Sequence, residues 1–532
     1  MSLNHKPYQS IRHFSSLMSD YLDEKDLLKP LYHRFPKMEN FEQQILEKQS
    51  EWSNAQVKRE LLSDVLQHQY ESIEDKEQSI QNINLLKDQA TFTVTTGHQL
   101  NLFTGPLYFL YKIISTINLC QQLQEKHPNY NFVPVYWMAT EDHDFEEIQY
   151  FNYGDKKVVY NREATGGVGR LSNDGLDDVF SAFKDLLGKH DHAVEVLSLF
   201  EKGYLENKNL ADATRVIAHE LFKEQGLVII DADNERLKSL AIPYFKEELV
   251  SKASFNAVSK TLETWPDQYK VQVNPREINL FYLTDDYRKR IIEKEGIYHI
   301  DETETSFTQE EILKELENHP ERFSPNVIMR PLYQEVILPN LCYIGGGGEM
   351  AYWLELKDYF DSQQVSFPIL LLRNSALLVT KKQLDKLERM QLDVWDLFEQ
   401  DHKLTTRLTH KISGIEIDFS NQKEHLKQQF AALHLLATQT DSSFENAVKA
   451  QEHKQIKGLE HLEKRLLKAQ KRQLDDHLER ALKLKKELFP NDSLQERQTN
   501  FSVFYEEYGT AFIDNIKENL DPLDLRFTII KL

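Results

Sequence analysis

Short apolar runs alternate with amphipathic segments over the first 380 residues of the chain. Phe92 and Val94 alternate with threonines in Thr91–Thr96, which predicts a short buried strand. Phe132–Met138 predicts a second strand, and the first-turn proline Pro106 favours a helix between the two. A strand–helix–strand order predicts a parallel sheet. The fold class expected from this pattern is α/β, with a Rossmann-like core.

Later apolar runs extend the same pattern. Three further strands are predicted at Leu227–Ile230, Val336–Ile344 and Pro368–Leu372. A helix is predicted at Met350–Phe360, after a run of glycines. Helical patterns occupy 39–75 and 176–224. Segments of mixed character at about 150–225 and 250–325 are expected to be insertions into the core, which spans residues 1–380.

The composition changes from about 381 to 505, where leucine, lysine, glutamate and glutamine dominate. Apolar residues recur there at spacings of three, four and seven, and Asp441-Ser442-Ser443 interrupts the pattern. These residues are expected to form a helical hairpin or coiled coil that either packs on itself or makes a dimer. Residues 506–532 form a tail, and its β-rich part, Phe527–Ile530, is expected to return to the core.

Polar residues follow the first predicted strand. In an open parallel sheet, ligands bind at the carboxyl ends of the strands. Gly97-His98-Gln99 stands there, before a helix whose N-terminal N–H groups favour an anion. The same field is expected to lower the pKa of His98 and leave a neutral hydrogen-bond donor. The alternative interpretation is a turn glycine beside a surface histidine.

The second predicted strand ends at Glu141-Asp142-His143-Asp144, which places three carboxylates and an imidazole in four residues. This cluster could hold a divalent metal ion. Alternatively, its carboxylates bind an ammonium group or act as general base. An acidic helix N-terminus is the simpler structural alternative, and it accounts for Asp144 better than for the whole cluster.

Three further features are candidates for binding acid groups. Gly345–Gly348 lies between a predicted strand and a helix, and it matches neither a Walker loop nor the dinucleotide fingerprint. Arg330 and Arg373 are the candidate partners of a carboxylate or phosphate, although each could equally form a structural ion pair.

Composition excludes several classes. A net charge of −21 argues against a nucleic-acid or anionic-membrane surface, and no apolar stretch is long enough to cross a membrane. No secretory signal is evident, so a cytoplasmic protein is expected. Cys120 and Cys342 are expected to be small core residues rather than nucleophiles. The motifs G-x-S-x-G, H-E-x-x-H and C-x-x-C are not present.

Five stretches together resemble the BshC family of bacillithiol biosynthesis: Thr96–Tyr108, Val133–Ile148, Asn326–Glu335, Leu338–Trp353 and Arg373–Ser375. The resemblance covers nearly the whole chain. It implies a Rossmann-like core, which is similar to that of nucleotidyltransferases, and a C-terminal coiled-coil domain for homodimerisation.

The resemblance also implies a reaction, in which the carboxyl group of L-cysteine joins the amine of glucosaminyl-malate to give bacillithiol. Because an amide does not form directly from a free carboxylate, ATP with Mg is expected as activator, with no tightly bound cofactor. The catalytic candidates are His98, Asp142, His143 and Asp144. The substrate-binding candidates are Gly97, Gln99, Asn101, Thr104, Glu141, Arg330, Gly346, Gly347, Glu349, Arg373 and Asn374.

Two other function classes stay open from the residues. A metal-dependent hydrolase acting on a small polar substrate would use His98 and the Glu141–Asp144 cluster. A non-catalytic coiled-coil scaffold would use its Rossmann-like body only to bind a metabolite.

Overall fold

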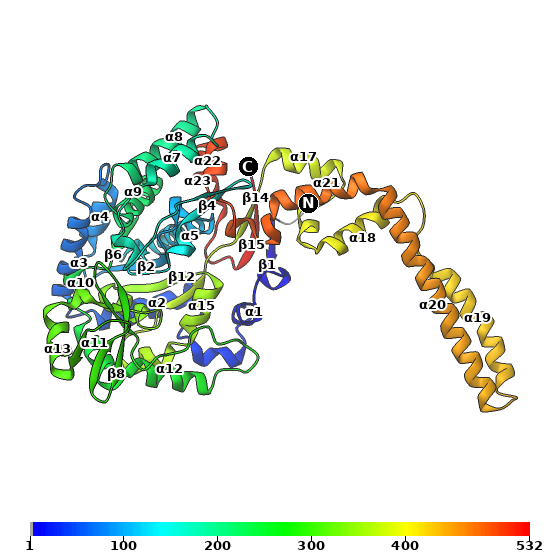
Figure 1. Ribbon diagram of the computed structural model, residues 1–532, viewed down its shortest axis with the longest axis horizontal. Coiled ribbons are helices and arrows are strands. Elements are labelled where there is room, and N and C mark those ends of the chain that lie inside the picture. The colour runs from blue at the N-terminus through cyan, green and yellow to red at the C-terminus, as the bar shows by residue number, and fades with distance from the viewer. Residues whose placement is uncertain (1–3) are drawn as a thin grey trace. The chain divides into compact units, whose positions relative to one another are not determined.

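The computed structural model describes residues 4–532, and a five-stranded parallel sheet lies at the centre of its larger unit (Figure 1). Every neighbouring pair in this sheet is parallel, which confirms the predicted fold class. The order of its strands is β13 (Ile369–Leu372), β12 (Asn340–Gly345), β2 (Thr91–His98), β3 (Asn131–Met138) and β6 (Val228–Asp231).

Apolar side chains between the sheet and its helices form the core. Helix α5 (Tyr108–Lys126) connects β2 to β3 and contacts both strands, while α2 (Met38–Glu51) packs on β12. The core residues include Phe92, Leu119 and both cysteines, which are buried and unpaired, as predicted. The remaining helices before the first insertion are α1 (Ser16–Leu22), α3 (Gln56–Gln69), α4 (Glu77–Leu85) and α6 (Phe145–Ile148).

Both predicted insertions contain regular structure. The first holds an antiparallel hairpin and three α-helices: β4 (Tyr150–Tyr153), β5 (Lys156–Val159), α7 (Leu176–Lys184), α8 (Asp191–Phe200) and α9 (Leu210–Phe222). The second contributes a five-stranded antiparallel sheet: β7 (Leu280–Leu283), β8 (Arg288–Lys294), β9 (Ile297–Ile300), β10 (Ser306–Thr308) and β11 (Phe323–Pro325). Helices α10 (Glu235–Ser239), α11 (Ile242–Ser251) and α12 (Ala253–Glu263) precede this sheet in sequence, and α13 (Gln309–Asn318) lies between β10 and β11.

Two boundaries differ from the prediction. The expected strand Val336–Ile344 begins only at Asn340, because Val336 and Ile337 end helix α14 (Met329–Ile337) and are buried there. Their apolar run is therefore the inner face of a helix. The expected helix Met350–Phe360 is two helices, α15 (Gly347–Leu354) and α16 (Lys357–Ser362).

The second unit is helical and spans Val379–Asp492. In Figure 1 its two long helices, α19 (Ser420–Ala437) and α20 (Ser442–Gln473), lie side by side, and Asp441 caps α20 as a hairpin break requires. Phe430, Ala437 and Val448 form its small apolar cluster. The other helices of this unit are α17 (Lys381–Arg389), α18 (Asp401–Ile412) and α21 (Asp475–Leu488).

The segment 493–530 belongs to the larger unit, so the helical unit ends before residue 505. Buried Gln495 and Glu496 explain the difference, since both hydrogen-bond the main chain at Ala376 and Leu378. Helices α22 (Ser502–Tyr508) and α23 (Ala511–Asn519) follow, and then β15 (Arg526–Lys531) lies between β1 (His5–Pro7) and β14 (Ala376–Val379). Phe527–Ile530 thus lie in a strand that belongs to the larger unit. No helix of residues 4–532 has the length and apolarity needed to span a membrane.

Candidate functional site

The predicted polar segments meet at the carboxyl edge of the parallel sheet, around two adjoining cavities. The first, which we call the glycine-loop cavity, has a volume of about 410 Å³ and is lined by Gly97–Gln99, Gly346–Glu349 and Arg373. The second, the arginine cavity, has a volume of about 500 Å³ and is lined by Glu141–His143 and four arginines. Both cavities share Trp137, Ala139, Asp142, Val327 and Arg330 as lining residues.

Glu349 organises the glycine-loop cavity. Its carboxylate accepts hydrogen bonds from the Gly346 N–H (2.8 Å) and the Tyr343 hydroxyl (2.6 Å), and its Oε2 lies 2.5 Å from Lys112 Nζ. Burial would raise the pKa of Glu349, but the Lys112 ammonium holds it below its ordinary value. Lys112 also donates to the Gly97 carbonyl (2.7 Å), so one lysine joins the two glycine segments.

Two arginines in this cavity have a guanidinium nitrogen without a hydrogen-bond partner. Arg373 is buried and forms an ion pair with Glu496 (2.8 Å), yet its Nε is unpartnered. Arg330 donates to Gln334 (2.9 Å), and its Nη2 is unpartnered. Because a buried polar group without a partner costs free energy, these nitrogens indicate where a ligand oxygen would be stabilised. Arg373 therefore has the structural ion pair as well as a free donor.

His98 differs from the prediction in its surroundings. It is the last residue of β2 rather than part of a loop, it is buried, and its ring lies against Tyr108 and Phe109. Its pKa is lowered well below the ordinary value, first by burial and then by the Lys112 charge. The predicted neutral state is supported, although the cause is burial and not a helix dipole.

We therefore expect His98→Gln to leave the pH dependence of activity unchanged between pH 5.5 and 8. A histidine whose pKa lies far below 6.5 is neutral throughout that interval and cannot produce a transition in it. Comparing the pH profiles of kcat/KM for both proteins tests this. A wild-type transition near pH 6.5 that His98→Gln removes would contradict it.

Asp142 stands where the two cavities meet. Its Oδ2 accepts from Gln99 Nε2 (2.8 Å) and its Oδ1 from the His143 N–H (2.8 Å). Burial would raise the pKa of this carboxyl group, but the hydrogen bonds from His143 and Gln99 lower it to about 2. So low a pKa makes Asp142 a weak base and a permanent negative charge, which suits the binding of an ammonium group better than proton abstraction.

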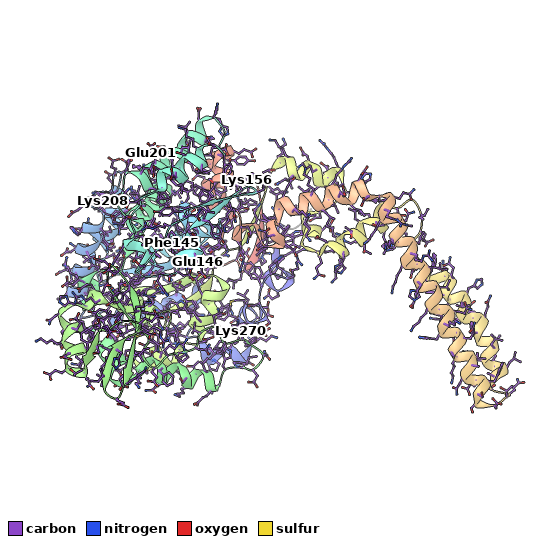
Figure 2. All side chains as sticks on the ribbon, in the orientation of Figure 1. Phe145, Glu146, Lys156, Glu201, Lys208 and Lys270 are labelled. Carbon is purple, nitrogen blue, oxygen red and sulfur yellow. The ribbon has the colours of Figure 1, made fainter. Side chains whose placement is uncertain are left out.

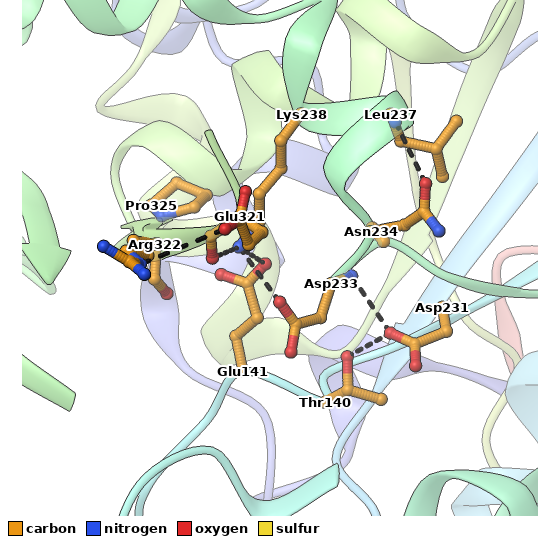
Figure 3. A network of polar contacts seen from close by, with 12 residues as sticks. Thr140, Glu141, Asp231, Asp233, Asn234, Leu237, Lys238, Glu321, Arg322 and Pro325 are labelled. Carbon is orange, nitrogen blue, oxygen red and sulfur yellow. Dashed lines mark hydrogen bonds and ion pairs between the residues drawn. The ribbon is translucent and has the colours of Figure 1, made fainter. Parts of the chain in front are cut away.

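Glu141 belongs to a buried charge network with Lys238 and Asp233 (Figure 3). Lys238, with a fully buried side chain, lies 2.8 Å from Glu141 and 3.1 Å from Asp233, and Arg170 also pairs with Asp233 (2.8 Å). Asp231 accepts from the Thr140 hydroxyl (2.5 Å) and has its pKa raised to about 6, first by burial and then by Asp233. Glu141 lines the arginine cavity, but its partner is Lys238.

The other two residues of the acidic cluster diverge from Asp142. His143 is half-exposed, and its Nδ1 lies 3.2 Å from Arg288 Nη1. Asp144 is the N-cap of α6, where it accepts from the Glu147 N–H (3.4 Å); Phe145 and Glu146, labelled in Figure 2, follow it in this helix. The simpler interpretation of Asp144 as a helix-terminal acid thus fits its position.

Besides Asp144, three predicted residues lie outside the two cavities. Asn101 lines a third, polar cavity of about 300 Å³ that shares Gln99 with the glycine-loop cavity. Thr104 is buried in a turn at a positive φ of 68°. Asn374 is buried. Its side-chain oxygen accepts a hydrogen bond from Ser115 Oγ (2.9 Å), and its side-chain nitrogen donates one to the Asp521 carbonyl (2.7 Å). The structure therefore does not bring Thr104 or Asn374 to the site.

Several residues that line the cavities were not predicted. Lys112 was hidden in the apolar pattern of α5, and Arg497 falls inside the sequence range assigned to the coiled coil. Arg276, Arg288 and Arg290 come from the second insertion. The basic run Arg288-Lys289-Arg290 in so acidic a chain was the one available signal for the last two.

The geometry does not gather the acidic cluster into a metal site. Glu141 is paired with Lys238, Asp142 with Gln99, and Asp144 with a helix N-terminus. Across residues 4–532, no group of three or more His, Cys, Asp or Glu side chains has a metal-binding arrangement.

The fold and this candidate site define an α/β protein with a Rossmann-like sheet, whose two adjoining cavities lie at the carboxyl ends of the strands. Residues 1–374 match the family description "Bacillithiol biosynthesis BshC, N-terminal Rossmann-like domain", and residues 376–532 match the C-terminal coiled-coil domain of the same family. The chain belongs to the BshC family.

Curated relatives agree with this assignment. A Flavobacterium johnsoniae protein named "Putative cysteine ligase BshC" is 57% identical over 99% of both chains. A Christiangramia forsetii protein of the same name is 56% identical over 100% of this chain and 99% of its own. A more distant Bacillus cereus relative of that name is 27% identical over 96% of this chain and 95% of its own.

Proposed function

We propose that this chain is a ligase that joins the carboxyl group of L-cysteine to the amine of glucosaminyl-malate, in the last step of bacillithiol biosynthesis. The name of the relatives supports cysteine ligation. The observation that carries the proposal is the meeting of two cavities at Asp142 and Arg330. An activated acid in one cavity and an amine donor in the other would come together at that shared wall.

The glycine-loop cavity would hold the activating group, which we propose to be the phosphates of ATP with Mg. The N–H groups at the start of α15, together with Lys112 and the unpartnered Nε of Arg373, are donors suited to phosphate oxygens. A Cβ at Gly97 would lie 3.0 Å from the Tyr343 hydroxyl, so this position favours glycine and keeps the wall open. ATP would supply the leaving group for the cysteine carboxyl oxygen.

The chain's own residues would place the reacting groups. Asp142, ionised because its pKa is about 2, would hold the cysteine ammonium. A C–N bond forms between the cysteine carboxyl carbon and the sugar amine, one carboxyl oxygen leaves with the phosphate-bearing fragment, and the amine loses a proton. His143 is the candidate acceptor of that proton: its Nδ1 accepts a hydrogen bond from Arg288, and it would take the proton once that hydrogen bond is released.

Arg497 provides a test of the glycine-loop cavity. It lines this cavity from the segment after the helical unit, and its neighbour Glu496 is fixed by Arg373 and the Ala376 N–H. We expect Arg497→Ala to weaken the binding of inorganic pyrophosphate and Mg-ATP roughly three- to tenfold, the usual effect of removing one charged donor. Calorimetric titration measures this, with Arg389→Ala in the helical unit as the control. Equal affinities in both variants would contradict it.

The direct test of the proposed reaction is to incubate the purified chain with glucosaminyl-malate, cysteine and Mg-ATP and to follow the products by mass spectrometry. Bacillithiol together with AMP supports adenylyl activation, and bacillithiol with ADP supports an acyl phosphate. Formation of glucosamine or cysteine fragments alone would instead favour the hydrolase. No turnover, with metabolite binding retained, would favour the scaffold.

A homodimer formed through the helical unit is part of the proposal. Leu433, Leu435 and Leu436 of α19 and Phe444 and Leu462 of α20 are exposed apolar side chains on this hairpin. We expect a mass twice the 62.6 kDa of one chain in light scattering, and a shift towards one chain in Leu435→Glu. A single-chain mass for the wild type at micromolar concentration would contradict this prediction.

A further inference from the structure

Four arginines line the arginine cavity: Arg276, Arg288, Arg290 and Arg330. They come from three separate segments, namely the loop before β7, strand β8 and helix α14. Such a concentration of positive charge stands out in a chain whose net charge is −21. The cavity therefore differs in sign from the rest of the molecule.

These guanidiniums form no direct ion pairs within residues 4–532, although Glu141, Asp142 and Asp233 favour the Arg288 charge at longer range. Within the described part of the chain, Arg288 donates to Ser324 Oγ (2.9 Å) and the Pro325 carbonyl (3.1 Å), and Arg330 donates to Gln334. All three acceptors are neutral. No ion pair joins any of the four arginines to a carboxylate among residues 4–532.

The carboxylates that line the same cavity are engaged elsewhere. Glu141 and Asp233 share Lys238, and Asp233 also pairs with Arg170. Asp142 accepts from Gln99 and His143. The lining therefore has four guanidiniums against three carboxylates, and two of those carboxylates are already paired with Lys238.

The strand geometry brings two of these guanidiniums together. Arg288 and Arg290 are two residues apart in β8, so their side chains leave the same face of the strand. The Arg288 guanidinium lies 4.1 Å from the centre of the Phe281 ring, and Phe281 is paired with Arg290 in the neighbouring strand. Lys289 lies between them on the opposite face and pairs with Glu302.

We propose that the arginine cavity binds the two carboxylates of a small dicarboxylic acid group. Uncompensated charge at a partly buried site is unfavourable, and arginine binds a carboxylate through two parallel hydrogen bonds. One acid group of such a ligand would pair with Arg288 and Arg290 on the face of β8, and the other with Arg276 or Arg330 on the neighbouring segments. If the proposed function holds, this ligand is the malyl part of glucosaminyl-malate, which places the sugar amine towards Asp142 and the shared wall.

Calorimetric titration of the full-length chain with L-malate, its uncharged dimethyl ester and glucosaminyl-malate tests this site without requiring turnover. We expect L-malate and glucosaminyl-malate to bind and the ester not to. Arg290→Ala and Arg276→Ala should each weaken binding of both acids about tenfold or more, the effect of losing a charged hydrogen-bonding partner. Lys289→Ala, on the same strand but facing away, should bind as the wild type does.

The outcomes separate this site from the ligase proposal. If the wild type binds L-malate, Arg290→Ala abolishes that binding and the wild type forms no amide, the dicarboxylate site is upheld and the ligase is refuted. Equal binding in Arg290→Ala, Arg276→Ala and Lys289→Ala refutes the site, as does a wild type that binds neither acid. Arg290→Lys controls for folding, because it keeps the charge and should retain binding within a few fold.

Discussion

Asp142→Asn is expected to reduce kcat/KM for cysteine by at least about a hundredfold while the protein remains folded. The carboxylate is ionised at neutral pH because its pKa is about 2, and its loss would leave a bound ammonium without a counter-charge. Asparagine keeps an oxygen for the His143 N–H, and the Gln99 amide can turn to present its own oxygen. The chemistry should therefore fail without loss of structure.

Glu146→Gln is the matched control for this variant. Glu146 is an exposed acid of α6, four residues further along the chain, and it lines neither cavity. Steady-state rates of thiol product formation and circular dichroism spectra should be collected for both variants. Normal turnover in Asp142→Asn would remove Asp142 from the site, and equal losses in both variants would indicate a general effect of charge.

Lys238→Met is expected to have the largest effect on stability, a loss of about 3–5 kcal/mol in the free energy of unfolding. Lys238 is fully buried and compensates both Glu141 and Asp233 (Figure 3). Methionine fills similar space but leaves Glu141 buried without a positive partner. Because Glu141 precedes Asp142 directly, the positions of Asp142 and His143 should also be disturbed.

Urea unfolding followed by tryptophan fluorescence measures this loss, since Trp52, Trp137, Trp265 and Trp353 lie in the larger unit and only Trp395 lies in the helical one. Lys87→Met is the control, because Lys87 is partly exposed and its contact with Asp64 is 3.5 Å. Its effect should stay within about 1 kcal/mol. A Lys238→Met midpoint equal to that of the control would show that the network contributes little.

The parallel sheet was predictable because its strands are short apolar runs separated by helices. β2 and β3 were found within two residues of their ends. The start of β12 was missed because the apolar run at Val336 forms the inner face of a helix, and local pattern alone does not separate these cases. The antiparallel sheet of the second insertion was missed for two reasons. Polar and apolar residues alternate only weakly in its strands, such as β8, and β7 pairs with β11, which is distant in sequence.

The lining of the candidate site was predictable where polar residues come soon after a strand, as Asp142 comes four residues after the end of β3. Lys112 was not predictable, because it lies in the apolar pattern of α5 and reaches the cavity only through the contact of that helix with β2. Arg497 was assigned to the coiled coil because nothing local signals that 493–530 return to the larger unit. The pattern of one segment cannot show its contacts with segments far away in the sequence.

The central claim, that this chain activates and transfers the cysteine carboxyl group, is tested most directly with cysteine carrying ¹⁸O in both carboxyl oxygens. After incubation with glucosaminyl-malate and Mg-ATP, mass spectrometry should find one ¹⁸O in the amide product and the other in AMP or phosphate. Amide product with no ¹⁸O in either AMP or phosphate, or no amide at all beside intact ATP, would contradict the account.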